Sequence, residues 1–130
     1  MTISVFGNIL VEKDAALVRL LPWLKKQFPQ HTFIFQDPVE DLQIPQEEWW
    51  ILDLAEGIDR VVVFSNLDKF VRNKGTSVHD YDLFMELKLQ QKLGRLPEIL
   101  KIIAIPTTMP EKEIKEVLKS YFLSLDKRLS

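Results

Sequence analysis

The sequence contains no cysteine. This absence excludes disulfide bonds, zinc sites built on thiolates and a cysteine nucleophile, because each of these needs a thiol. Any bound metal ion must therefore be held by histidine, aspartate or glutamate. Only two histidines are present, so an imidazole ligand has just two possible sources.

Long apolar runs are also missing. No stretch approaches the roughly 20 residues that a helix needs to cross a bilayer. The first residues, Met1 to Phe6, lack the charged segment that opens a secretory signal peptide. We therefore expect a cytoplasmic protein without membrane insertion.

No excess of positive charge is found. The formal net charge is −2, and lysines and arginines are interspersed with acids along the chain. Binding to DNA or RNA depends on basic surface that neutralises phosphates, so we expect no nucleic-acid partner.

The common catalytic signatures are absent as well. There is no Gly-x-Ser-x-Gly elbow, no His-Glu-x-x-His pair and no Gly-x-x-x-x-Gly-Lys phosphate loop. Serine hydrolase, zinc peptidase and nucleotide-binding functions therefore lose support. At 130 residues the chain can bury one core, and we expect a single domain over residues 1–130.

What the sequence does contain is a central apolar run at residues 48–57. It is too short for a typical helix and too apolar for a half-exposed strand, so it predicts a strand buried on both faces. Trp49 and Trp50 should then point to opposite sides of the sheet. Other strands are expected at 2–6, 32–35, 60–64 and 99–105, and helices at 14–28, 80–93 and 110–125.

These elements predict an α/β fold with a mixed sheet. The strand at 60–64 follows the central one too closely for a helical crossover, so it must pair antiparallel or lie at an edge. Gly94 is expected to end the second helix.

Acidic residues stand at several junctions between these elements. Asp53 closes the central strand, and ligands of open α/β sheets bind where strands end. The alternative is that Asp53 only caps the turn before Gly57. Asp37 finishes the second strand, and Asp14 follows the first strand as a helix N-cap.

The two histidines differ in their surroundings. His31 begins the second strand and is expected to be a solvated strand-end residue. His79 lies where a polar loop meets an amphipathic helix, beside Asp80 and Asp82; it is a ligand candidate, although a capping or surface role is the alternative.

Asp14, Asp53 and His79 should meet at one edge of the sheet. Two carboxylates and one imidazole can hold a divalent first-row metal ion while leaving positions for water or a substrate carbonyl. An open site of this kind suits hydrolysis or transient recognition of a metal.

The order of these residues resembles that of the NiFe-hydrogenase maturation endopeptidases, in particular short archaeal-type members. The resemblance spans about residues 3–105. It rests on Gly7-Asn8-Ile9-Leu10, an acid six residues past the asparagine at Asp14, and then Asp37, Asp53 and His79.

This resemblance implies a three-layer α/β/α sandwich with a mixed, mostly parallel five-stranded sheet of phosphorylase/hydrolase-like type. It also implies that Asp14, Asp53 and His79 bind nickel. Our hypothesis for catalysis by this aspartic-type endopeptidase is that one of the carboxylates Asp14, Asp53 and Asp37 assists proton transfer while the metal polarises the scissile carbonyl or a water. The nickel would arrive on the substrate, and cadmium or zinc could replace it in crystals.

The implied partner is the nickel-loaded precursor of a hydrogenase large subunit, whose C-terminal tail is removed; the enzyme itself is expected to be a monomer. The chain departs from the family pattern at three places. Aspartate replaces the usual glutamate at Asp14, Ala15-Ala16-Leu17-Val18 replaces an Asp-x-x-Gly-like sequence, and Pro38-Val39 replaces the glycines after Asp37.

Two other functions remain open from the sequence. One is a non-catalytic nickel-binding or scaffold homologue of these peptidases. The other is a small doubly wound domain that binds an unrelated metabolite, although the lack of a glycine-rich phosphate loop argues against nucleotides.

Overall fold

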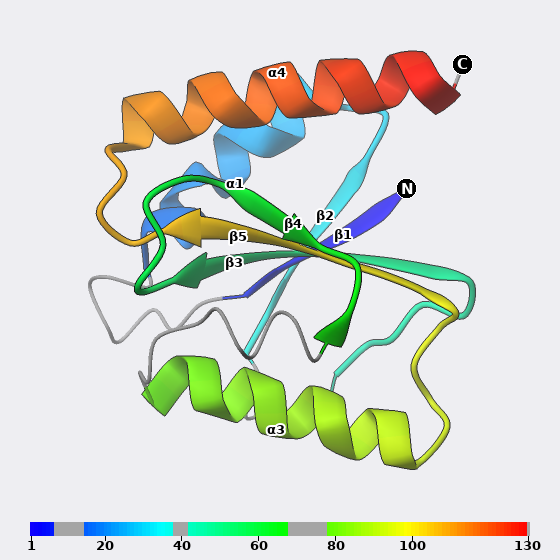
Figure 1. Cartoon of the computed structure of the whole chain (residues 1–130). Coiled ribbons are helices and arrows are strands. Elements are labelled where there is room, and N and C mark those ends of the chain that lie inside the picture. The colour runs from blue at the N-terminus through cyan, green and yellow to red at the C-terminus, as the bar shows by residue number, and fades with distance from the viewer. Residues whose placement is uncertain (7–14, 38–41, 68–77, 130) are drawn as a thin grey trace.

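The computed structural model describes residues 1–6, 15–37, 42–67 and 78–129, and within them a five-stranded sheet flanked by helices (Figure 1). The strands are β1 (Thr2–Phe6), β2 (Thr32–Gln36), β3 (Glu48–Ala55), β4 (Val62–Phe64) and β5 (Ile99–Pro106). The helices are α1 (Ala15–Gln27), α3 (Val78–Lys92) and α4 (Glu111–Leu129).

The sheet is mixed and mostly parallel, as the sequence predicts. Its strand order is β2-β1-β3-β5-β4, so β3 is central. β1 pairs parallel with β2 and β3, and β3 pairs parallel with β5. β4 pairs antiparallel with β5 and lies at the edge of the sheet. Its neighbour in the sheet is therefore β5 and not β3, the strand that precedes it in the chain.

The helices form two layers, one on each side of the sheet (Figure 1). α1 and α4 pack on one face, where Leu20 and Leu118 belong to the same apolar cluster as Trp50. α3 covers the other face, where Leu83 and Leu87 join the cluster that contains Trp49. The three-layer α/β/α architecture is therefore confirmed, and so is the placement of the two tryptophans on opposite faces.

Helical periodicity explains why α4 lies where it does. Ile114, Leu118 and Phe122 recur every four residues and are at most 1% exposed. The ring of Phe122 packs 4.9 Å, between centroids, from that of Phe28, which follows α1. This contact joins the two helices of the layer.

α3 ends in a Schellman motif. The amide of Gly94 donates to the carbonyl of Gln91, and the amide of Arg95 donates to that of Gln90. Gly94 has a φ of +69°, the left-handed conformation that the motif requires and that glycine adopts without strain. The prediction that Gly94 ends this helix is confirmed.

The expectation of a solvated His31 is wrong. His31 is 8% exposed, and its Nε2 lies 2.8 Å from Oδ1 of Asp126, near the end of α4. Its ring also packs against Phe122. The long C-terminal helix covers the start of β2, which a reading of the local sequence does not reveal.

None of the described helices combines the length and apolar character needed to cross a membrane.

Candidate functional site

Asp53 lies on the α3 face of the central strand. Trp49, Ile51 and Ala55 occupy the alternate positions of β3 that pack beneath α3, and Asp53 shares their parity. It is 0% exposed. A fully buried carboxylate among apolar neighbours is costly unless it is paired, hydrogen-bonded or coordinated, so this position is unlike a solvated turn cap.

The strand continues beyond Asp53, which differs from the expectation that Asp53 closes it. Asp53 is in register with Ala104 of β5, and pairing extends to Ala55 and Pro106. The ladder with the long strand β5 keeps these residues extended. Asp53 is thus held by strand pairing on a rigid element, close to the edge where β3 ends.

His79 lies in the first turn of α3, which begins at Val78, two residues earlier than expected. Leu83 and Leu87, which face the sheet, follow position 79 at spacings of four and eight residues. Position 79 therefore lies on the same helical stripe as these leucines. Figure 1 shows that α3 begins at the edge of the sheet where β3 and β5 end. The backbone thus places position 79 at the same edge of the sheet as Asp53, whereas the side chain of His79 is not among those that the structure describes.

Asp37 immediately follows β2, at the same edge of the sheet but farther across it. Val5 is in register with both Phe35 and Leu52, so Asp37 lies one residue beyond the level of Asp53. β2 and β3 are separated by β1, which corresponds to about 9.5 Å between the two strands. Asp37 and Asp53 therefore do not lie on adjacent strands of the sheet.

Asp14 lies outside the described residues, as does the loop at 7–13 that precedes it. Among the side chains that the structure describes, which do not include that of His79, no group of three or more His, Asp or Glu residues forms a metal site. The full set of ligands expected from the sequence thus remains a prediction.

A buried polar network next to this site was not anticipated. The hydroxyl of Ser4 accepts hydrogen bonds from Nε1 of Trp49 at 2.8 Å and from Nε2 of Gln36 at 2.6 Å. The Gln36 amide also bonds both backbone groups of Gln43: its Oε1 accepts from the Gln43 amide, and its Nε2 donates to the carbonyl. The network ties the segment before β3 to the sheet. The one residue in the sequence that could have indicated this network is Ser4, a polar residue within an apolar strand.

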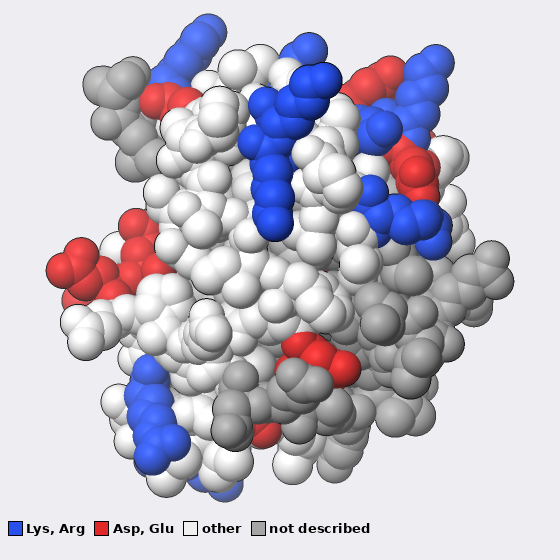
Figure 2. All heavy atoms as spheres, turned by 180° about the vertical axis from the view of Figure 1, so that it is seen from behind, with Lys and Arg blue, Asp and Glu red and all other residues white. Residues whose placement is uncertain are grey.

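The face seen in Figure 2 carries both acidic and basic side chains, some of them next to one another, and uncharged surface over much of its middle. Among the described ion pairs, Arg19 Nε and Glu111 Oε1 lie 2.9 Å apart, and both side chains are about half exposed. Such exposed pairs contribute little to stability, so this ion pair adds little to the packing of α1 against α4.

This arrangement is the fold of the hydrogenase maturation endopeptidases. The hydrogenase maturating endopeptidase HybD from Escherichia coli superposes with a TM-score of 0.62 at 16% identity, over 98% of this chain and 94% of that one. The NiFe-hydrogenase maturation protease HybD from Thermococcus kodakarensis gives a TM-score of 0.54 at 19% identity, over 81% and 78%.

An uncharacterised protein from Wolinella succinogenes has a comparable TM-score of 0.61 at 13% identity, over 99% of this chain and 98% of its own. At these identities the likeness concerns the fold. No protein-family model matches the chain. A comparison of the sequence with curated proteins also finds no significant match.

Proposed function

We propose that the protein is an endopeptidase that removes the C-terminal tail of a nickel-loaded hydrogenase large-subunit precursor. The observation that carries the proposal is the placement of Asp53. A fully buried carboxylate lies near the end of the central strand, facing the helix whose first turn contains His79. The proposal is further supported by the HybD fold, which matches along almost the whole chain.

In this proposal the nickel is part of the substrate. Asp53, His79 and Asp14 recognise it, so that only a precursor that has received its metal is cut. A carboxylate and an imidazole are suitable donors for a divalent first-row ion. Because Asp53 is fixed by strand pairing, it meets the metal with little reorganisation.

Cleavage needs a polarised scissile carbonyl and an activated water. The substrate's nickel supplies Lewis acidity beside the bond, and a carboxylate accepts a proton from the attacking water. Asp14 and Asp53 are candidates for this role. Asp37 is a third, and its place two strands away from β3 means that it would act on the peptide rather than on the metal.

The test is to incubate the purified full chain with a nickel-loaded large-subunit precursor and to follow release of the tail by mass spectrometry. Wild type should release it, whereas His79→Ala and Asp53→Asn should lose at least about a hundredfold in rate, because each removes one metal ligand. Glu113→Gln, which removes an exposed acid on α4, is the control for charge and should cut normally.

Circular dichroism of each variant shows whether it is folded. If folded His79→Ala cuts as fast as wild type, the assignment of this ligand is wrong. If wild type binds Ni²⁺ in a calorimetric titration but leaves the tail intact, the alternative of a non-catalytic nickel-binding homologue replaces the peptidase.

A further inference from the structure

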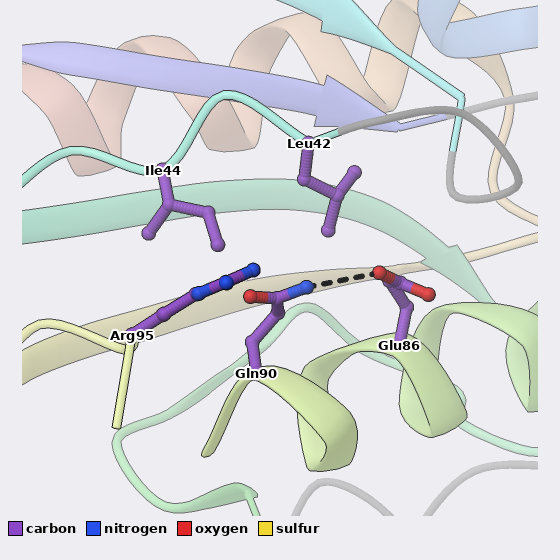
Figure 3. Close-up of a pocket in the computed structure, with 5 residues that line it drawn as sticks. All are labelled: Leu42, Ile44, Glu86, Gln90 and Arg95. Carbon is purple, nitrogen blue, oxygen red and sulfur yellow. Dashed lines mark hydrogen bonds between the residues drawn. The ribbon is translucent and has the colours of Figure 1, made fainter. Parts of the chain in front are cut away.

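A pocket lies between the second half of α3 and the segment that precedes β3. It has a volume of about 600 Å³ and is lined by Leu42, Ile44, Glu86, Gln90 and Arg95 (Figure 3). Volumes of roughly 300–1,000 Å³ are typical of sites for small ligands. α3 begins at the proposed peptidase edge, so the pocket at its other end is separate from that site.

Gln90 gives the pocket a hydrogen-bonding requirement. The residue is 8% exposed, and its Nε2 donates to Oε1 of Glu86 at 3.1 Å. That bond fixes the orientation of the amide, because a carboxylate can accept from the nitrogen but cannot donate to the oxygen. The other end, Oε1, is buried and has no hydrogen-bond partner among the described residues. Buried acceptors are rarely left in this state, so a donor from a ligand fits here.

The remaining lining residues define what else a ligand carries. Arg95 follows the Schellman turn and is exposed, and its side chain extends beneath Ile44 (Figure 3). A guanidinium binds carboxylates through two parallel hydrogen bonds. Leu42 and Ile44 point into the same space from the opposite side and supply an apolar wall (Figure 3).

The apolar wall is held in place by the buried network. The side chain of Gln36 bonds both backbone groups of Gln43, which stands between Leu42 and Ile44. The pocket therefore has one wall fixed to the sheet and one formed by a helix, so its shape is largely preformed.

We propose that this pocket binds a small zwitterion with an apolar side chain, either a free amino acid or a short peptide. The ligand's ammonium group donates to Oε1 of Gln90 and to the carboxylate of Glu86. Its carboxylate pairs with Arg95, and its side chain packs on Leu42 and Ile44. One acid and one base at the two ends of the lining match the two charges of such a ligand.

The test is a titration of the ¹⁵N-labelled full chain with leucine and with leucyl-leucine, followed by two-dimensional NMR. Saturable shifts should concentrate at the amides of Leu42 and Ile44 and at the side chains of Gln90 and Arg95. N-acetyl-leucyl-leucine and leucyl-leucine amide each lack one charge and should bind at least about tenfold more weakly. Binding of leucine alone, of the dipeptide alone or of both supports the proposal and identifies the source.

Variants test the assigned roles. Arg95→Gln, at an exposed position after α3, should make the dipeptide and its amide bind equally weakly. Lys92→Gln removes an exposed charge at the C-terminal residue of α3, outside the pocket, and should change nothing. Gln90→Leu should abolish binding. The midpoint of thermal unfolding of Gln90→Leu should not fall below that of Glu86→Gln, so that the loss of binding is not caused by unfolding. The proposal is overturned if neither ligand gives saturable shifts at the pocket, if the blocked ligands bind as well as the zwitterions, or if Arg95→Gln binds normally.

Discussion

Replacing Ser4 with alanine tests how the interior polar network contributes to stability. Ser4 and Trp49 are both 0% exposed, and the Ser4 hydroxyl is the acceptor for the indole N–H at 2.8 Å. In Ser4→Ala that N–H stays buried without an acceptor. Gln36 is affected less, because its Nε2 also donates to the carbonyl of Gln43 at 3.1 Å.

The expected loss follows from this difference. A buried donor left without a partner costs about 1–3 kcal/mol, so we expect Ser4→Ala to lower the free energy of unfolding by about 2 kcal/mol. For a domain of this size, that corresponds to a fall in Tm of roughly 8 °C. Ser120→Ala, on the exposed side of α4, is the matched control and should change stability by less than about 0.5 kcal/mol.

A double-mutant cycle isolates the hydrogen bond from other effects. Urea unfolding is followed by circular dichroism for Ser4→Ala, Trp49→Phe and the double variant. Because Trp49→Phe removes the donor, the double variant should be more stable than the sum of the single changes predicts, by about 1 kcal/mol or more. Additivity within about 0.3 kcal/mol would refute the argument, because it would mean that the bond does not couple the two residues.

Two further predictions concern the helices. Gly94→Ala should destabilise the protein by about 1 kcal/mol, because the φ of +69° strains a residue with a Cβ, while nothing within 4 Å would clash with that Cβ. Gly94→Asn should cost less, because asparagine tolerates the left-handed conformation better. Equal costs of the two variants in thermal unfolding would show that backbone strain is not the cause. Leu118→Ala, at a position that is 0% exposed, should lower the free energy of unfolding by about 2–5 kcal/mol. Leu123→Ala, at a position 52% exposed on the same helix, should lower it by less than about 1 kcal/mol. Similar losses for the two variants in urea unfolding would mean that α4 does not pack as described.

Much of the fold could be predicted because its signals are local. The apolar run at 48–57 predicts a buried central strand, and β3 occupies residues 48–55 at the centre of the sheet. The spacing of Ile114, Leu118 and Phe122 predicts a helix with one buried face, and those residues are buried. Periods of two and 3.6 residues reflect the geometry of a strand and of a helix, so a short window of sequence contains them.

The candidate site was predictable to a lesser extent. The sequence selects Asp53 and His79 as polar residues at the ends of elements, and the backbone places them at one edge and on one side of the sheet. It predicts the parity of Asp53 within β3, because strand alternation is local. The expectation that Asp53 closes the strand fails, because Ala55 pairs with Pro106 of β5, about fifty residues further along the chain.

By itself, then, the sequence determined the kinds of elements, their order and which side of each is apolar. Tertiary structure alone decided that β4 pairs with β5 and that Asp126 lies against His31. It also decided that Gln36 hydrogen-bonds Gln43 and so fixes one wall of the pocket that Gln90 lines. These contacts join residues that are brought together by the strand order and by the packing of helices on the sheet. Local periodicity does not encode that order, because the same alternating patterns are compatible with several arrangements of the strands.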